Sequence, residues 1–386
     1  MKLLVLAEGY PYGNSLAGVF HVNQLRLITH AGVDVTVVAP TPWVPPGLAG
    51  LKDRWRQYDQ APRIQEVDGF KVLRPRYPAF PGEHKFPLQH LFQYMAVRTL
   101  NLPQPDIIQS FFALPLGAVG NLLAEKWNVP HVVNMLGDDV TVMPYLSEGH
   151  RRLFTRVLEQ ADGVLATGPS LAAEAENISG CPVGSLALGV NKERFINLPS
   201  KEEARRQLDL PEDAFLALYV GGLLEPKGVL EFLEALPMVR SKKVIGLFVG
   251  DGPERQQVKQ TPRALSVGFQ PPEKVPAYMA AADVLLLPSH HEGLPNVVIE
   301  AGFAGLPVIG TDIGGIVDLI GDNRGYIVPV KSPENIASTI DYVAANPEEA
   351  ARTAKCLGEH AMAHYEVHST TKRLVELYRS LVKEPS

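Results

Sequence analysis

The sequence has 386 residues, 46% of them hydrophobic, and a formal net charge of −6. This length favours two domains over one, and the slight acidity gives no overall attraction to nucleic acid. The N-terminal apolar run KLLVLA stops at Glu8, which is typical of a buried strand rather than a signal peptide. No run of 18 apolar residues occurs, so no membrane span is expected. Two distant cysteines without neighbouring ligand patterns indicate a reduced, cytoplasmic protein with no thiol-based metal site.

Short apolar runs alternate with helical patterns along the first half of the chain. The runs expected to be strands are residues 2–7, 33–40, 106–110, 131–135 and 163–167. Continuous apolar runs of this length are typical of strands that are buried on both faces of a parallel sheet. Residues 20–32 have helical spacing and end at Gly32. The first half therefore predicts a series of βαβ units.

Residues 41–105 interrupt this alternation with an insert rich in proline, aromatic and basic residues. Two interpretations remain open: a solvated surface excursion, or a surface for an anionic acceptor or a membrane. The second interpretation predicts that serine at the four arginines Arg54, Arg56, Arg74 and Arg76 weakens that interaction. Further basic residues of the insert include Lys52, Arg63, Lys71 and Lys85.

A second series of strand patterns begins near residue 213. Its expected strands are residues 214–221, 244–250, 264–269, 284–288 and 307–310. We place the domain boundary at 198–199, in a polar, proline-containing segment, which gives domains 1–198 and 199–366. The helical pattern at 367–386 is expected to return to the first domain. We predict an α/β fold of two Rossmann-like, parallel-sheet domains that face each other across a cleft.

Two glutamates, Glu292 and Glu300, flank the expected start of a helix at residues 295–305. Pro295 favours the first turn of this helix, because its missing N–H has no partner to lose there. The free backbone amides of that turn can bind phosphate, and the carboxylates on either side can accept hydrogen bonds from hydroxyls. A nucleotide-sugar presents this combination of groups. In a simpler interpretation, Glu292 caps the helix and Glu300 is an exposed helix residue.

Three glycine-containing turns follow expected strands of the second domain, at the same edge of the sheet as Glu292. They are 221-GGLLEPKG-228, 250-GDGPE-254 and 311-TDIGG-315. Glycine lets a backbone approach a ligand closely, and Lys227 in the first turn can neutralise a diphosphate. Each turn alone is equally consistent with an ordinary turn or a surface lysine. Their position at one edge favours a ligand site.

With these motifs the sequence resembles the retaining glycosyltransferases of family 4, which have the GT-B fold. The resemblance covers essentially the whole chain, and its most specific part is EGLPNVVIEA, which matches the family's Glu-x7-Glu motif. Other family elements are matched by 221-GGLLEPKG-228 (GRL–KG), 250-GDGPE-254 (G-GP), 189-GVNKERF-195 (NGVD–F), 136-LGDDV-140 (GSDV) and the opening loop and helix at 18–40.

The resemblance implies a role for each matching position. The implied donor-binding residues are Gly222, Lys227, Gly250, Gly252, Phe269, Glu292, Gly293, Leu294, Asn296, Val297 and Glu300. Within this set, Lys227 and the Asn296 and Val297 amides would hold the diphosphate. Glu300 would bind the ribose, Glu292 would bind the transferred sugar, and the base would lie near 267–269. The implied catalytic residues are Glu292, Lys227 and Asp139. The implied acceptor-side residues are Gly18 and Asp139.

The sequence departs from the family pattern at three places. Gly222 stands where the family often has arginine, so one positive charge at the diphosphate is missing, and Lys227 or Arg255 must compensate. The opening loop has 17-AG-18 in place of two glycines. Residues 134-NML-136 stand where the family often has histidine.

The implied reaction moves a sugar from a nucleoside-diphosphate sugar to an acceptor hydroxyl with retention of configuration. No cofactor or metal is expected, and the sequence contains no Asp-x-Asp. The acceptor would be a glycan, a lipid-linked sugar or a small molecule in polysaccharide or glycoconjugate biosynthesis, and nucleic acid is not expected as a partner. We expect a cytoplasmic protein, placed at the inner face of the membrane if its acceptor is presented there. A GT-B-fold sugar-nucleotide epimerase and a non-catalytic nucleotide-binding scaffold remain alternatives.

Overall fold

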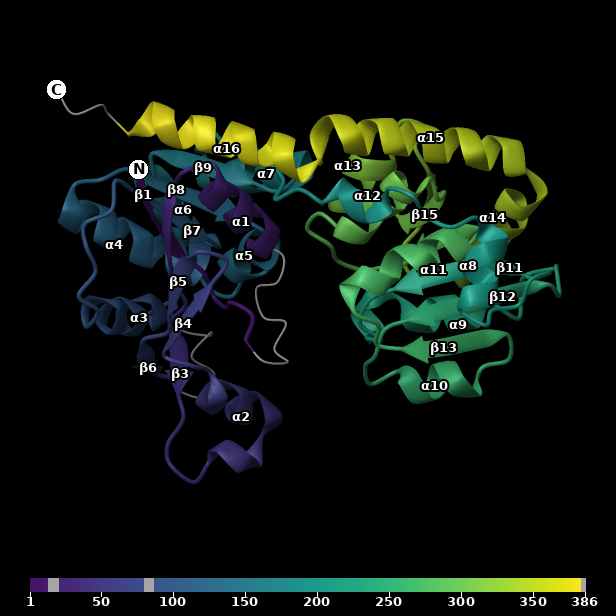
Figure 1. The fold of residues 1–386 in the computed structure, drawn as a ribbon, viewed down its shortest axis with the longest axis horizontal. Helices are drawn as coiled ribbons and strands as arrows, with labels where there is room; N and C mark the ends of the chain where they lie inside the picture. The colour runs from purple at the N-terminus through teal and green to yellow at the C-terminus, as the bar shows by residue number, and fades with distance from the viewer. Residues whose placement is uncertain (13–20, 80–86, 383–386) are drawn as a thin grey trace. The chain divides into compact units, whose positions relative to one another are not determined.

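A computed structural model describes residues 1–12, 21–79 and 87–382 of the chain. The chain divides into two compact units (Figure 1): Met1–Leu188 together with the segment from Val367 onward, and Gly189–Glu366. This division falls earlier than the boundary expected at 198–199. The physical reason is that Val190 belongs to the second unit, where its N–H donates to the carbonyl of Tyr365 (2.8 Å). We call the two parts unit 1 and unit 2.

Unit 1 contains an eight-stranded sheet in the order β10-β9-β8-β7-β1-β2-β5-β4. All neighbouring pairs are parallel except β4–β5. The strands are β1 (Lys2–Leu6), β2 (Asp34–Val38), β4 (Ile64–Val67), β5 (Phe70–Leu73), β7 (Ile107–Phe111), β8 (His131–Met135), β9 (Gly163–Ala166) and β10 (Gly184–Ser185). The five strands predicted for this half are confirmed as β1, β2, β7, β8 and β9.

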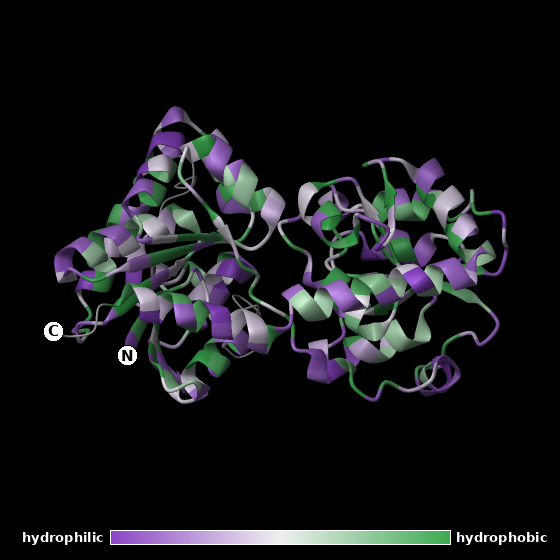
Figure 2. Ribbon diagram, turned by 90° about the horizontal axis from the view of Figure 1, so that it is seen from above, coloured by the Kyte–Doolittle hydropathy of each residue, from purple (hydrophilic) through white to green (hydrophobic). Residues whose placement is uncertain are grey.

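Helices cover both faces of the unit 1 sheet, because alternate residues of each strand point to opposite faces. Leu3 and Val5 of β1 pack with α1 and α16, whereas Leu4 and Leu6 pack with α3 and α4. The strands are accordingly rich in hydrophobic residues, while the helices carry both polar and hydrophobic residues (Figure 2). The helices are α1 (Val22–His30), α3 (Gln89–Arg98), α4 (Ala118–Trp127), α5 (Asp138–Thr141), α6 (Glu148–Gln160), α7 (Pro169–Ser179) and α16 (Val367–Leu381).

The insert at 41–105 is built into unit 1 more firmly than a solvated excursion. Strand β5 pairs in parallel with β2, and its Phe70 and Val72 are buried. The interpretation as a solvated excursion is therefore wrong for this part, since the short FKVL run has the alternation of a strand with one buried face. The insert also contains β3 (Thr41–Trp43), α2 (Asp53–Gln60) and β6 (Arg76–Pro78), and β3 and β6 form a separate two-stranded sheet.

Unit 2 contains a six-stranded, fully parallel sheet in the order β13-β12-β11-β14-β15-β16. The strand order reverses between β11 and β14, which makes their carboxyl ends the place where open α/β sheets bind ligands. The strands are β11 (Phe215–Val220), β12 (Val244–Val249), β13 (Ala264–Gly268), β14 (Val284–Leu287), β15 (Val308–Thr311) and β16 (Tyr326–Val328). The first five confirm the predicted strands.

Along the chain, α8 precedes the strands of unit 2 and the other helices lie between and after them (Figure 1). They are α8 (Lys201–Gln207), α9 (Val229–Ala235), α10 (Arg255–Gln260), α11 (Val275–Ala281), α12 (Asn296–Ala304), α13 (Gly314–Ile320), α14 (Pro333–Ala345) and α15 (Pro347–His364). Among the helices described in the two units, none combines the length and the hydrophobicity that a membrane span requires.

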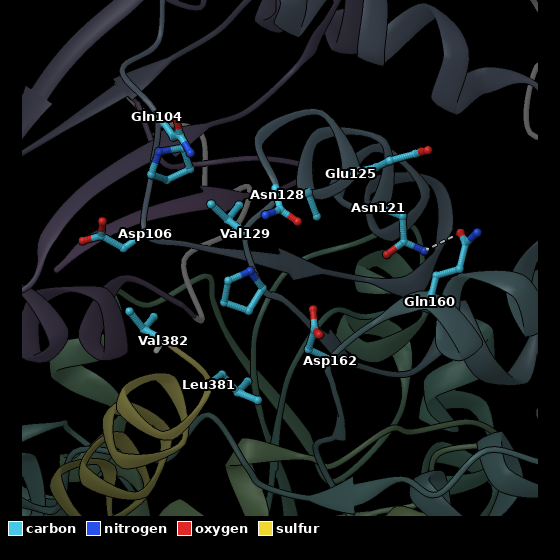
Figure 3. A pocket seen from close by; sticks show the side chains of 13 residues that line it. Gln104, Asp106, Asn121, Glu125, Asn128, Val129, Gln160, Asp162, Leu381 and Val382 are labelled. Atoms are coloured by element: carbon cyan, nitrogen blue, oxygen red, sulfur yellow. Dashed lines mark hydrogen bonds between the residues drawn. The ribbon is translucent and has the colours of Figure 1, made fainter. Parts of the chain in front are cut away.

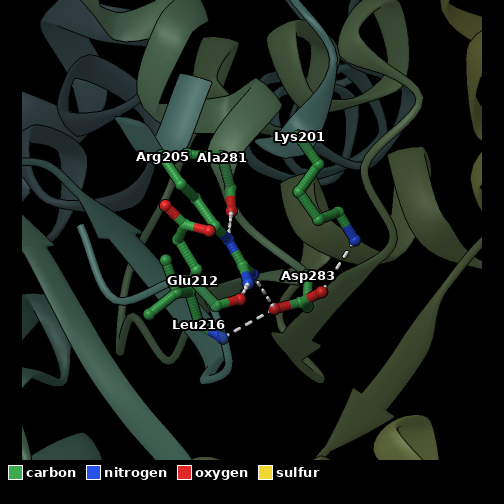
Figure 4. Close-up of polar contacts among 6 residues, drawn as sticks. All are labelled: Lys201, Arg205, Glu212, Leu216, Ala281 and Asp283. Carbon is green, nitrogen blue, oxygen red and sulfur yellow. Dashed lines mark hydrogen bonds and ion pairs between the residues drawn. The ribbon is translucent and has the colours of Figure 1, made fainter. Parts of the chain in front are cut away.

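Aspartates that immediately precede strands fix the amino edges of both sheets. Asp283 accepts hydrogen bonds from the backbone N–H of Leu216 and from Arg205 and Lys201, each at 2.7 Å (Figure 4). In unit 1, Asp106 accepts from the N–H of Lys2 (2.6 Å) and Asp162 from that of His131 (2.9 Å). Each carboxylate thus satisfies a strand-end amide that would otherwise lack a partner.

A cavity of about 840 Å³ opens at this amino edge of unit 1 (Figure 3). Its lining includes Asp106, Asn121, Gln160 and Asp162, and Asn121 donates to Gln160 (3.2 Å). The residues singled out from the sequence follow the strands instead, so they belong to the opposite, carboxyl edge of each sheet.

Candidate active site

The loops that carry the candidate residues of unit 2 meet where its strand order reverses. The loop after β11 contains Lys227, and the loop after β14 contains Glu292. Lys227 Nζ lies 2.8 Å from Glu292 Oε1, and the two side chains are 36% and 15% exposed. The structure therefore brings together the cation and the carboxylate that the sequence separates by 65 positions.

The Glu292 carboxylate is oriented by a second donor. Ser289 Oγ donates to the same Oε1 atom at 2.8 Å, and the Ser289 carbonyl in turn accepts from Thr311 Oγ1 at 2.6 Å. Among the described residues, nothing donates to Oε2 of Glu292. One oxygen is thus fixed by the protein, and the other can accept a hydrogen bond from a ligand hydroxyl.

The two loops pack backbone against backbone. A side chain at Gly228 would place its Cβ 1.9 Å from the carbonyl oxygen of Pro288, and Gly228 also has φ +71°. The N–H of His290 donates to the carbonyl of Pro226 at 2.9 Å. The Lys-Gly pair therefore has a physical basis: the lysine points to the site and the glycine allows the neighbouring loop to close on it.

The glycines of the 250–254 loop have a similar role. A Cβ on Gly250 would lie 1.8 Å from Gly221 O, and one on Gly252 would lie 2.4 Å from Leu223 O. Protein backbone therefore fills the space beside both glycines. Close packing of the two loops thus explains glycine at these positions, in addition to the close approach of a ligand that we expected from the sequence. Direct contact of Gly250 and Gly252 with a donor stays a prediction.

Helix α12 begins at Asn296, directly after Pro295, and confirms the predicted helix start. No side chain caps this start, so its first backbone amides, including those of Asn296 and Val297, are available to an anion. The interpretation of Glu292 as the cap is wrong, because its carboxylate binds Lys227 and Ser289. The preceding Gly293 carbonyl packs against α13, where a Cβ on Gly315 would lie 1.5 Å from it.

Glu300 lies on α12 and is only 15% exposed, so the interpretation as an exposed helix residue is also wrong. Its Oε1 atom accepts from Arg194 at 3.0 Å. Burial raises the pKa of the Glu300 carboxyl, and the Arg194 guanidinium opposes this rise. Arg194 was missed as a site residue, although it lies inside the matched segment GVNKERF.

Further residues around the Lys227–Glu292 pair were also missed by sequence reasoning. Tyr219 donates its hydroxyl to Gly222 O (2.7 Å), and burial together with the Glu292 charge raises its pKa. His290 Nε2 lies 2.8 Å from Glu231 Oε1. Tyr219 could have been identified from the sequence, because it lies near the end of a predicted strand that leads into the Lys227 loop.

Two other expected donor residues lie at the ends of neighbouring strands. Phe269, directly after β13, is 55% exposed and presents a ring to solvent. Arg255, considered as a replacement for the missing arginine, lies 2.9 Å from Asp251 of its own loop. Part of its charge is therefore already neutralised, which leaves Lys227 as the stronger candidate for the diphosphate.

On the carboxyl edge of unit 1, Asp139 is 1% exposed and has a structural task. Its Oδ2 accepts from Ala113 N (2.8 Å), and its Oδ1 accepts from Leu136 N (3.1 Å) and Gly137 N (2.9 Å). Burial raises the Asp139 pKa while these backbone amides oppose the rise. Asp139 thus positions the turn after β8, and a direct part in catalysis stays a prediction. Gly18 lies outside the described residues.

Glu8, which follows β1 at the strand-order reversal of unit 1, was missed by sequence reasoning. Desolvation and the nearby Asp139 carboxylate raise its pKa to about 7, and Arg54 opposes this rise. Glu8 is exposed at this edge and interacts electrostatically with Asp139, which makes it a further acceptor-side candidate.

Two of the four insert arginines are not surface cations, which corrects the expectation for this segment. Arg74 is 2% exposed and donates to the Pro62 and Tyr10 carbonyls (3.3 and 3.0 Å) and to Gln65 (2.7 Å); burial lowers its pKa to about 10. Arg76 donates to backbone carbonyls at both of its terminal nitrogens. Of these four arginines, the two that are exposed are Arg54 and Arg56, which lie on α2.

The fold and site define a GT-B glycosyltransferase, and comparison with known proteins agrees. Residues 19–188 match the family described as glycosyl transferase 4-like domain, and residues 200–356 match glycosyl transferases group 1. The chain is 34% identical to TuaC of Bacillus subtilis, a glycosyltransferase assigned to teichuronic acid biosynthesis, over 99% of both chains. The chain belongs to the GT4-type glycosyltransferases.

Solved structures show the same fold. Sucrose-phosphate synthase from Thermosynechococcus elongatus has a TM-score of 0.80 at 23% identity, with 98% of each chain covered. HepE from Anabaena, solved in complex with UDP-glucose, has a TM-score of 0.74 at 18% identity, covering 99% of this chain and 100% of its own. At these identities the likeness is one of fold alone.

Proposed function

We propose that the protein transfers a sugar from a nucleoside-diphosphate sugar to an acceptor hydroxyl, with retention of anomeric configuration. The observation that carries this proposal is the Lys227–Glu292 pair beside the uncapped start of α12, at the strand-order reversal of unit 2. A cation, free amides and a carboxylate with one unoccupied oxygen suit a ligand that has both a diphosphate and hydroxyls.

The charges match the demands of the reaction. As the sugar–phosphate bond breaks, negative charge grows on the leaving diphosphate, where Lys227 and the α12 amides stabilise it. Positive charge grows on the sugar ring, where Glu292 stabilises it. The acceptor oxygen forms the new bond to the anomeric carbon on the same face, and its proton passes to the departing phosphate oxygen. We expect no metal, because protein groups supply the charge.

The donor proposal extends to the nucleoside. Glu300, with Oε1 held by Arg194, has Oε2 for ribose hydroxyls, and Phe269 offers an exposed ring near the base position. The HepE structures hold UDP and UDP-glucose, which supports a uridine diphosphate donor as the first choice.

The acceptor proposal rests on TuaC and on the insert. The assignment of TuaC to teichuronic acid biosynthesis supports a role in polysaccharide synthesis. Around α2, Trp43 and Leu51 are 51% and 69% exposed, next to the exposed Lys52, Arg54 and Arg56. Apolar side chains beside cations suit the surface of an anionic membrane, so we propose peripheral membrane association with a glycan or lipid-linked acceptor.

Thermal unfolding with UDP, GDP, ADP and their sugar conjugates, with and without EDTA, tests the donor proposal. A ligand at about 100 times its Kd stabilises the folded state by about 2.7 kcal/mol. A shift with one nucleotide family, unchanged by EDTA, is expected. If no nucleotide shifts the transition, the nucleotide-sugar proposal is wrong. Product formed from donor alone would favour the epimerase. The anomeric configuration of the transferred sugar, measured by NMR and compared with that of the donor, decides whether configuration is retained.

A further inference from the structure

A second polar pair joins the same two loops of unit 2 that carry Lys227 and Glu292. Glu231 lies in the first turn of α9 and His290 lies two positions before Glu292. His290 Nε2 and Glu231 Oε1 are 2.8 Å apart, and the side chains are 10% and 13% exposed. Neither residue belongs to the motifs that the sequence analysis matched.

The pair acts on the backbone next to both donor-site side chains. His290 is bonded to Ser289, whose Oγ orients Glu292, and the His290 N–H donates to Pro226, the residue before Lys227. A displacement of His290 therefore moves the hydroxyl that holds Glu292 and the carbonyl that anchors the Lys227 turn. Loops alone are poorly suited to hold such geometry, and catalytic groups need to be held to within about 0.5 Å.

Within the described ranges of the chain, His290 is the partner of the Glu231 carboxylate. Its Oε2 atom is buried and has no hydrogen-bond partner among the described residues. Burying a carboxylate is unfavourable unless it is compensated, and the His290 imidazole is the compensation at 2.8 Å. A largely buried carboxylate that bonds an imidazole from a neighbouring loop is suited to orient that loop.

We propose that Glu231 and His290 form a positioning pair that sets the separation of Lys227 and Glu292 for the donor diphosphate. Glu231 holds the imidazole, the imidazole fixes the loop after β14 against the loop after β11, and the site is thereby preorganised. This inference rests on the proposed donor function. Glu231 and His290 themselves are positioning residues and touch no reacting atom.

The test compares Glu231→Ala with Glu234→Ala, a matched control that removes an exposed glutamate from the same helix. Glu231→Ala is expected to lower kcat/KM for the donor at least tenfold and to weaken UDP binding, with UMP binding unchanged, because the β-phosphate contact depends on Lys227. Glu234→Ala is expected to match the wild type. Glu231→Gln keeps an oxygen acceptor for the imidazole N–H and is expected to recover most of the activity.

A double-mutant cycle separates positioning from general stability. Glu231→Ala added to Lys227→Ala is expected to cost little beyond Lys227→Ala alone, because both act on the same contact. Additive losses, or a folded Glu231→Ala with wild-type kinetics, would overturn the proposal. If Glu231→Ala does not fold, His290→Asn provides the same comparison with a polar side chain too short to reach Glu231. A wild-type protein that neither binds UDP nor transfers sugar would overturn the donor function first and this inference with it.

Discussion

Lys227 Nζ and Glu292 Oε1 lie 2.8 Å apart, and the two residues reach this contact from the loops that follow β11 and β14. These strands flank the reversal of strand order in unit 2. In parallel α/β sheets the chain diverges at such a point, so the loops on either side leave room for a ligand. The pair therefore combines the best placed cation and carboxylate of unit 2 for a diphosphate sugar.

Replacement of Lys227 by alanine should lower turnover at least tenfold while the fold is nearly unchanged. The ion pair is partly exposed, so its loss should cost less than about 1 kcal/mol of unfolding free energy. Initial rates and urea unfolding of the variant measure the two effects. A variant with full activity would remove Lys227 from the phosphate role.

Introduction of arginine at Gly222 should restore the cation that this chain lacks. Of the described residues, a Cβ at Gly222 meets the Leu224 side chain, with Cδ1 at 3.4 Å and Cγ at 3.6 Å; these are ordinary contacts, so the site has room for a side chain. Donor KM should fall severalfold, and Gly222→Ala serves as the control without the charge. At Gly250 the same change should disrupt folding, because the Cβ would lie 1.8 Å from Gly221 O. A stable Gly222→Arg with unaltered donor KM would contradict the missing-cation interpretation.

Glu300→Ala should raise the donor KM strongly, because it removes the carboxylate proposed for the ribose. Arg194→Ala, which leaves Glu300 in place but frees its Oε1, should raise the donor KM less. Steady-state kinetics with donor and acceptor varied separately distinguish the two substrates. A change confined to the acceptor KM would show that the ribose assignment is wrong.

Serine at Arg54 and Arg56 should weaken binding to vesicles that contain anionic lipid, because both side chains are exposed on α2. Serine at Arg74 should instead destabilise the fold by about 2–4 kcal/mol, since one buried and two partly buried hydrogen bonds lose their donor. Vesicle co-sedimentation and chemical unfolding measure these outcomes. Unchanged sedimentation of the Arg54/Arg56 variant would exclude the insert as a membrane surface.

Stability should fall as the pH drops below about 6.5, in part because of His131. This buried imidazole bonds Ser110 (2.8 Å) and Asn121 (2.6 Å), and burial lowers its pKa from 6.5 to about 3. Between pH 3 and 6.5 the unfolded chain binds a proton that the folded chain does not, so folding weakens by at most about 1.4 kcal/mol per pH unit for this group. His131→Gln should show a shallower dependence in unfolding experiments from pH 4 to 7. If the free energy of unfolding changes equally with pH in both proteins, the loss of stability at low pH comes from other groups.

The sequence predicted the long strands because each is a continuous apolar run, as buried parallel strands require. Strands β5 and β16 were missed because they have four and three residues and depend on pairing with β2 and β15. In the same way, Arg74 looks like a surface cation in sequence, and only the fold shows that it is buried.

Some residues of the candidate site could be predicted from the sequence, and others could not. The Glu292 loop, Lys227 and the start of α12 were predictable from local motifs. The contacts of Glu300 with Arg194 and of Glu231 with His290 join residues 106 and 59 positions apart, which no local pattern reveals. The requirement for glycine at positions 228 and 250 also comes from tertiary packing, since each glycine allows a carbonyl from another loop to approach.

Calorimetric titration of UDP and UMP into the wild type and Lys227→Met measures whether Lys227 binds the donor diphosphate. If Lys227 binds the diphosphate, the wild type should prefer UDP over UMP at least tenfold, and the variant should lose this preference while its UMP affinity is unchanged. A variant that keeps the full preference for UDP would contradict the assignment of Lys227, and with it the account of the donor site.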